Sequence, residues 1–340
     1  MSLEVVFWTT VGFAFALGAV VGSFLNVVIH RVPAGMSVVQ PPSHCPACQT
    51  QIAWYDNIPI ISWALLLRGR CRHCDAPIPA RYTVVEALSG IVIAGLWFKI
   101  AHASFASTAS FAQLDLMTIA LPFGMYAVFL WLLIAITFVD LEHLIIPHKF
   151  TVPGMVLGLA LPWIFDFAFQ PGDIPDLWPP VTWLESSIGF AVGGISVIVI
   201  FYAYYAVRGV AGIGGGDVTL MAMVGAWLGW PAIVFIFFAA SLQGTLAAVG
   251  GMLLGGGLVR DSRDVLDDGT EQGQHDDPPD IDESDTAATV EPGGDEDDEQ
   301  GQMAVPFGPF IALAAAEYLL VGDLLPSAIS MSYLYQFGSW

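Results

Sequence analysis

Apolar residues along the chain are gathered into long runs that contain few charged positions. Eight such runs lie near residues 5–29, 82–103, 117–139, 150–169, 184–206, 218–230, 232–254 and 305–322. A helix needs about 20 apolar residues to cross a bilayer, so the pattern predicts an all-α polytopic membrane protein with about eight transmembrane helices. The run at 218–230 is short and joins the next through Trp230 and Pro231, which leaves the boundary between these two helices open.

The composition points the same way. Apolar residues make up 56% of the chain, charged residues only 12%, and the mean hydropathy is +0.68. Soluble proteins carry about 25% charged residues, and a globule of this size would lack the polar side chains to cover its surface. The composition therefore excludes a soluble enzyme and makes the lipid bilayer a partner of the chain, and it carries no signal of an oligomeric state.

Most of the negative charge belongs to one segment. Residues 261–301 hold 17 of the 31 acidic residues and one Arg, and so account for −16 of the formal net charge of −21. With few apolar residues to bury, this segment is expected to form a disordered, solvated insert at 261–302. A second interpretation is that it attracts a basic peptide. No basic patch exists elsewhere, which excludes nucleic acid as a partner.

Nine of the ten Lys and Arg residues fall in loops on one side of the eight predicted helices. The positive-inside rule makes this side cytosolic and places both termini on the side that faces away from the cytosol. The N-terminus lacks the cationic segment of a signal peptide, since only Glu4 is charged before the first apolar run. The chain then divides into a first transmembrane helix (1–29), a cytosolic loop (30–81) and a membrane-embedded core (82–260). The acidic insert (261–302) follows, and a last helix with its tail (303–340) ends the sequence.

All four cysteines lie in the first cytosolic loop, as two CxxC pairs formed by Cys45, Cys48, Cys71 and Cys74. Two such pairs offer four thiolates for a tetrahedral zinc ion, so we expect a small zinc-binding loop domain. A closed four-thiolate site leaves no position for a substrate, which makes the zinc structural. Two disulfides or four free thiols are the alternatives, of which disulfides are disfavoured on the reducing side. His44 or His73 could replace one cysteine as a ligand.

Two aspartates stand at the cytosolic ends of apolar runs. Asp140 closes the third run, and Asp217 opens the sixth directly after Gly214, Gly215 and Gly216. Ionisable groups at this depth are costly and usually functional, although an Asp in this position can also cap a helix. Two carboxylates that share one proton can activate a water and polarise a carbonyl, while the glycines leave backbone open to a second chain.

Three other polar residues near Asp140 are interpreted differently. Glu142 is expected to be a solvated charge at the membrane surface rather than a third catalytic acid. His143 and His148, on either side of Pro147, are expected to be interfacial polar residues.

These motifs resemble those of the type IV prepilin peptidases, which are bacterial GxGD-type aspartyl proteases, and the resemblance covers nearly the whole chain. The end of the first run is similar through residues 22–27 and 30–33. The catalytic motifs are similar through Thr137, Asp140, Ile146, Pro147, Gly214, Gly216, Asp217 and residues 225–229. In the loop, the similar positions are the four cysteines with Trp54, Asp56, Asn57, Ile58, Pro59, Ser62, Trp63, Arg68, Gly69, Arg81, Tyr82 and Glu86. The chain departs from the family at His148, where an acid is common, and at Thr219, where a Lys is common.

The resemblance implies a bacterial inner-membrane enzyme with Asp140 and Asp217 as its catalytic pair. The substrates would be prepilins or pseudopilins of pilus and secretion systems, cut after a Gly that ends a short basic leader on the cytosolic face. Family members with the cysteine loop often also methylate the new N-terminus with S-adenosylmethionine, which suggests the loop as the methyltransferase part.

Other functions are compatible with the same residues. Another GxGD protease that cuts deeper in the membrane would use the same pair, although the aspartates lie at the ends of the runs. A proton-coupled transporter could use them as a relay, but no inverted repeat relates the two halves. A catalytically silent assembly factor is a third alternative, disfavoured because both aspartates are present.

Overall fold

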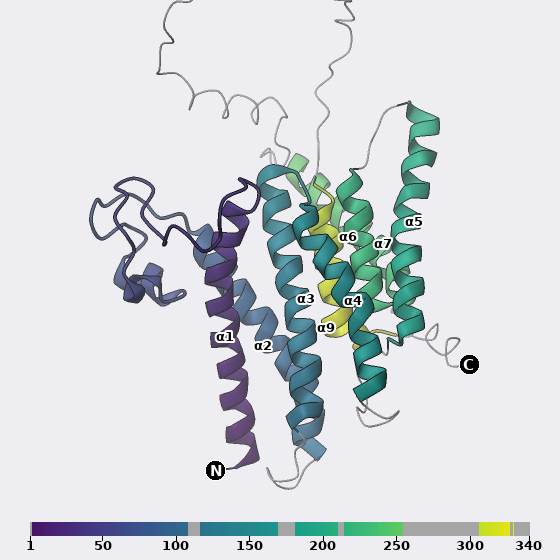
Figure 1. The fold of residues 1–340 in the computed structure, drawn as a ribbon, viewed down its shortest axis with the longest axis horizontal. Coiled ribbons are helices and arrows are strands. Elements are labelled where there is room, and N and C mark those ends of the chain that lie inside the picture. The colour runs from purple at the N-terminus through teal and green to yellow at the C-terminus, as the bar shows by residue number, and fades with distance from the viewer. Residues whose placement is uncertain are drawn as a thin grey trace, which may run out of the picture. The chain divides into compact units, whose positions relative to one another are not determined.

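The computed structural model describes residues 2–107, 116–168, 181–209, 214–253, 306–326 and 329. Figure 1 labels the helices along the chain. They are α1 (Leu3–Arg31), α2 (Arg81–Ser107), α3 (Leu116–His143), α4 (His148–Ala168), α5 (Trp183–Arg208), α6 (Gly215–Leu228), α7 (Trp230–Leu253) and α9 (Gly308–Val321). Short helical turns follow at η1 (Trp54–Asn57), η2 (Ser62–Leu66) and η4 (Gly322–Leu324). Within the described ranges, β pairing is confined to two isolated bridges in the loop between α1 and α2.

The all-helical prediction is confirmed, and each of the eight apolar runs forms one helix. Five of the helices, α1, α2, α3, α5 and α7, are long and apolar enough to cross a membrane. The predicted count of eight crossings is not confirmed, because α4, α6 and α9 are not among these five, and α6 and α9 have only 14 residues each. Such a helix rises about 21 Å, against a hydrocarbon thickness of about 30 Å.

The chain divides into two compact units. The first comprises residues Met1–Ser241 and Phe307–Trp340, and the second comprises Leu242–Pro306. The predicted acidic insert at 261–302 falls in the second unit and lies outside the described residues. All the features discussed below belong to the first unit.

Helix α6 occupies the interior of the first unit. It packs against α4, α5 and α9, while α3 packs against α2, α4 and α9. Every residue of α6 from Leu220 to Leu228 is buried, as expected for a helix that is apolar all round. The first turn of α6 lies at the edge of this interior, with Gly215 exposed and Asp217 half-buried.

Glycines let the helices approach closely. On α5 and α6, a Cβ added at Gly189 would overlap the Gly225 carbonyl oxygen, and one added at Gly225 would overlap that of Gly189. On α1 and α2, the Ser89 hydroxyl donates a 2.6 Å hydrogen bond to the Gly18 carbonyl. Small residues at such crossings are typical of membrane helices. In lipid there is no hydrophobic effect to drive helix association, so close packing of the backbones stabilises the contact instead.

We expect Gly225→Ala to lower the thermal unfolding midpoint of the purified protein, because the new methyl group must push α5 away from α6. Overpacking of this kind costs roughly 1–3 kcal/mol. Gly124→Ala in α3 is the matched control, since its Cβ would meet no atom within 4 Å and alanine is the better helix former. Equal midpoints for the two variants would contradict the packing described here.

Candidate active site

Asp140 lies in the last turn of α3 with only 5% of its surface exposed. The backbone N–H of Gly308, the first residue of α9, donates a hydrogen bond to its carboxylate. A Cβ added at Gly308 would overlap Asp140 Oδ2, so α9 can approach this closely only with glycine there. No local pattern in the sequence indicates this contact, because Asp140 and Gly308 lie far apart along the chain.

Asp217 occupies the third position of α6, and its carboxylate accepts a hydrogen bond from the Gly214 backbone N–H at the start of the helix. The three glycines before it differ in their surroundings. A Cβ at Gly216 would lie 2.7 Å from Ile146 Cβ, whereas nothing lies within 4 Å of one at Gly215 and only two atoms, at 3.9 and 4.0 Å, approach one at Gly214. The backbone at Gly214 and Gly215 is therefore open to a second chain.

Asp140 lies against the start of α9 and Asp217 lies in the first turn of α6, and these two helix starts meet at one side chain. Ile146 contacts Gly216 at the start of α6, and its Cδ1 lies 3.1 Å from the Cβ position of Gly308 at the start of α9. The charge of Asp217 acts directly on Asp140. Both carboxylates bind N–H groups at helix starts, so the helix-capping role considered for these residues is present. The same arrangement also brings the two acids close to each other around Ile146.

Glu142 is not the solvated charge that the sequence suggested. It forms an ion pair with Arg81, the first residue of α2, and its side chain is only 22% exposed. The pair ties the end of the cysteine loop to the turn of α3 that carries Asp140. The pairing was not evident from the sequence because the two residues lie far apart along the chain. His143 is exposed, as expected for an interfacial residue.

The two positions at which the chain departs from the family pattern contact each other. Thr219 Oγ1 lies 3.4 Å from His148 Nδ1 and donates a 2.9 Å hydrogen bond to the Gly216 carbonyl. This histidine–threonine contact joins α4 to the first turn of α6, at the place where the family resemblance leads us to expect an acid and a lysine. The two departures from the family pattern therefore affect a single contact, which lies beside Asp217.

We expect the double variant His148→Asp/Thr219→Lys to cleave substrate within a few-fold of the natural protein, because each new charge has a partner. Thr219→Lys alone should be slower, since it places an unpaired cation beside Asp217. A double-mutant cycle on cleavage rates measures the coupling, which for contacting residues is roughly 0.5–3 kcal/mol. Strictly additive effects would show that the two residues act independently.

The four cysteines form one cluster, as predicted. Their sulfur atoms all lie within 4.8 Å of one another, the Cys45 and Cys74 sulfurs are 3.8 Å apart, and all four thiols are free. Thiolates bound tetrahedrally to zinc at about 2.3 Å stand roughly 3.8 Å apart, so the donor set fits that ion. Within the described part of the chain, neither histidine considered as a ligand joins the cluster, and His44 Nδ1 instead lies 3.1 Å from the Pro42 carbonyl.

The two CxxC pairs fold as copies of one turn. The Cys45 N–H donates to the Thr50 carbonyl, and the Cys71 N–H donates to the Ala76 carbonyl, both at 2.9 Å. Hydrogen bonds from Thr50, through its hydroxyl and its backbone, lower the pKa of Cys48 to about 6. Backbone N–H groups of His73 and Cys74 likewise lower the pKa of Cys71. The turns therefore favour the thiolate form of Cys48 and Cys71, which is the form that binds metal.

Two family models match the chain. The bacterial peptidase A24 N-terminal domain matches residues 16–100, which include the four cysteines, and the type IV leader peptidase family matches residues 127–249, which include both aspartates. No solved structure gives a significant match.

Several curated relatives share the name prepilin leader peptidase/N-methyltransferase. The protein of that name from Myxococcus xanthus (strain DK1622) is 35% identical, over 94% of this chain and 93% of the relative. Those from Aeromonas hydrophila and Neisseria gonorrhoeae are each 33% identical, over 73% and 69% of this chain and over 83% and 80% of the relatives. With the family model spanning both aspartates and relatives matched along most of their length, the chain belongs to the type IV leader peptidase family.

Proposed function

We propose that this protein is a membrane aspartyl endopeptidase that removes the short basic leader of prepilins or pseudopilins and then methylates the new N-terminal amine. Family membership supports the peptidase, and the shared name of the relatives supports both activities. The observation that carries the proposal is the meeting of Asp140 and Asp217 at the starts of α9 and α6. A transporter and a deeper-cutting protease are not favoured, because the matched relatives carry neither name.

In the proposed mechanism, Asp140 and Asp217 share one proton. The ionised carboxylate takes a proton from a water molecule, and the protonated one donates a hydrogen bond to the scissile carbonyl and makes its carbon more electrophilic. The water oxygen then attacks that carbon, and the leaving amine receives a proton from the pair. The open backbone at Gly214 and Gly215 is where the substrate chain would lie.

The proposal includes the orientation of the protein in the membrane and a zinc ion bound by the cysteine loop. Placing the basic loops in the cytosol of a bacterial cell puts the aspartate pair at the cytosolic face of the inner membrane, with both termini in the periplasm. We assign a structural zinc to the four cysteines, which would fill all four positions around the ion. S-adenosylmethionine would supply the methyl group when bound.

Incubating the purified protein with a prepilin and analysing the products by mass spectrometry tests the proposal. We expect loss of the leader without any added cofactor, and one added methyl group on the mature chain when S-adenosylmethionine is supplied. An unchanged prepilin would contradict the peptidase, and a cleaved but never methylated product would contradict the second activity alone.

We further expect methyl transfer to be independent of the aspartate pair. Pre-cleaved pilin offered to the Asp217→Ala protein should be methylated at close to the natural rate, because the loop that we assign to this activity is a separate element. Mass spectrometry of the pilin N-terminus measures it. Loss of methylation in a protein whose thermal midpoint is unchanged would refute the separation of the two activities.

A further inference from the structure

Two adjoining hollows lie on the cysteine loop. The first, of about 520 Å³, is formed by loop residues alone and includes Gln51 and Trp54 in its wall. The second, of about 480 Å³, lies between the loop and α1, with Val20, Phe24 and Val27 of the helix in its wall. Ser43 and Asn57 line both hollows. Occupants of the two hollows would therefore meet at this shared wall.

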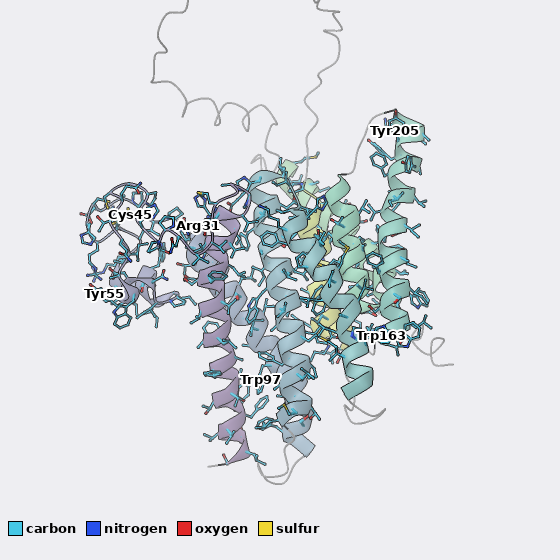
Figure 2. The ribbon with its side chains drawn as sticks, in the orientation of Figure 1. Arg31, Cys45, Tyr55, Trp97, Trp163 and Tyr205 are labelled. Carbon is cyan, nitrogen blue, oxygen red and sulfur yellow. The ribbon has the colours of Figure 1, made fainter. Side chains whose placement is uncertain are left out.

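The wall of the second hollow is held in place by hydrogen bonds from the helices. Arg31 at the end of α1 donates to the Ser37 carbonyl at 3.0 Å and to the Pro41 carbonyl at 2.8 Å. Glu86 of α2 accepts a 2.7 Å hydrogen bond from the Ile60 N–H. Figure 2 labels Cys45 and Tyr55 in the loop and Arg31 at the end of α1. The hollows are thus formed before any ligand binds, as is usual for small-molecule sites.

The first hollow has the chemistry of a nucleoside site. Trp54 has 81% of its surface exposed and offers a flat aromatic face on which a base can stack. The side-chain amides of Gln51 and Asn57 and the Ser43 hydroxyl supply both donors and acceptors for the edge of a base. An indole face also attracts a cation, and the sulfonium centre of a methyl donor carries a positive charge.

The second hollow suits an apolar chain that comes from the membrane. Its α1 wall continues into side chains that are open to lipid, with Val20 56% and Phe24 52% exposed, and its one cation, Arg31, is already bonded to two loop carbonyls. A cleaved pilin that keeps its apolar helix in the bilayer would present its new amine at the level of the loop. This occupant rests on the proposed function.

We propose that the two hollows are the methyl-transfer site, with an adenosyl sulfonium donor in the Trp54 hollow and the apolar N-terminus of the cleaved substrate in the α1 hollow. At the shared wall, the lone pair of the neutral amine attacks the methyl carbon. The new N–C bond forms as the C–S bond breaks, and the sulfur keeps the bonding electrons. The products are the neutral thioether S-adenosylhomocysteine and a methylated ammonium, which then loses its proton to water.

Calorimetric titration with S-adenosylhomocysteine tests the donor hollow without requiring turnover. We expect Trp54→Ala to weaken binding at least about tenfold through lost stacking. Trp54→Phe should retain most of the affinity, and Trp54→Leu, which lacks an aromatic face, should not. Trp8→Ala is the matched control, because Trp8 is also an exposed tryptophan but lies near the opposite end of α1. Zinc content and the thermal midpoint verify folding.

Filling the second hollow tests the substrate side. Val27→Trp should raise the KM for pre-cleaved pilin in methylation while the affinity for S-adenosylhomocysteine stays unchanged. If Trp54→Ala or Trp54→Leu binds S-adenosylhomocysteine as tightly as the natural protein, the donor assignment is wrong. If Val27→Trp has the KM of the natural protein, the substrate assignment is wrong and the second hollow is a lipid contact. If the natural protein methylates pilin but these variants do so equally well, only the site is wrong. If the natural protein neither binds the thioether nor methylates, the proposed second activity itself fails.

Discussion

Cys45→Ser is expected to reduce the zinc content from one ion per chain to nearly none and to abolish methylation. Three thiolates remain after the change, and zinc binding at such sites supplies about 10–16 kcal/mol of folding free energy. Because the loop between α1 and α2 has only two isolated β-bridges and short helical turns of its own, it should lose its structure when the metal leaves. Elemental analysis and limited proteolysis of the loop measure the two effects.

His44→Ala and His73→Ala are the matched controls for the zinc prediction. Both histidines lie next to a cysteine of the cluster but outside the cluster itself, so both variants should keep one zinc per chain. Folded natural protein without zinc, or full zinc retention in Cys45→Ser, would contradict the assignment.

Replacing Asp140 or Asp217 by Ala should abolish leader cleavage almost completely. Asp→Asn should fail as well, because an amide keeps the shape of the side chain but cannot exchange the shared proton. The cleavage rate of the natural protein should follow a bell-shaped pH profile that belongs to the pair. Asp323→Asn serves as control, because this aspartate instead pairs with Lys99. Serine and cysteine protease inhibitors should have no effect.

Gly308→Ala is informative beside these variants, because it touches the pair without removing an acid. The added methyl group would overlap Asp140 Oδ2 and disturb the hydrogen bond from the start of α9. A loss of activity in this variant would indicate that α9 positions Asp140.

Local features explain what could be predicted from the sequence. Apolar runs mark helices because a backbone in lipid must satisfy its own hydrogen bonds, and each run did form one helix. The cysteine cluster was predictable because each CxxC pair is a local turn. The break between α6 and α7, left open by the pattern, falls at Gly229, whose φ of 78° ends α6.

The contacts between distant segments could not be predicted in the same way. The approach of Gly308 to Asp140 and the Arg81–Glu142 pair depend on how helices pack, and no local pattern encodes them. The count of eight crossings, which included the short helices α6 and α9, is not confirmed either. Both short helices begin beside the aspartates, α6 at Gly215 and α9 at Gly308.

The most direct measurement is the rate of prepilin cleavage by the Asp140→Ala/Asp217→Ala double variant against each single variant, with folding verified by thermal unfolding. If the two carboxylates act as one unit on one water, the double variant should be little slower than either single variant. A well-folded single variant that keeps a tenth or more of the natural rate, a loss of at most about 1.4 kcal/mol in transition-state stabilisation, would contradict the account.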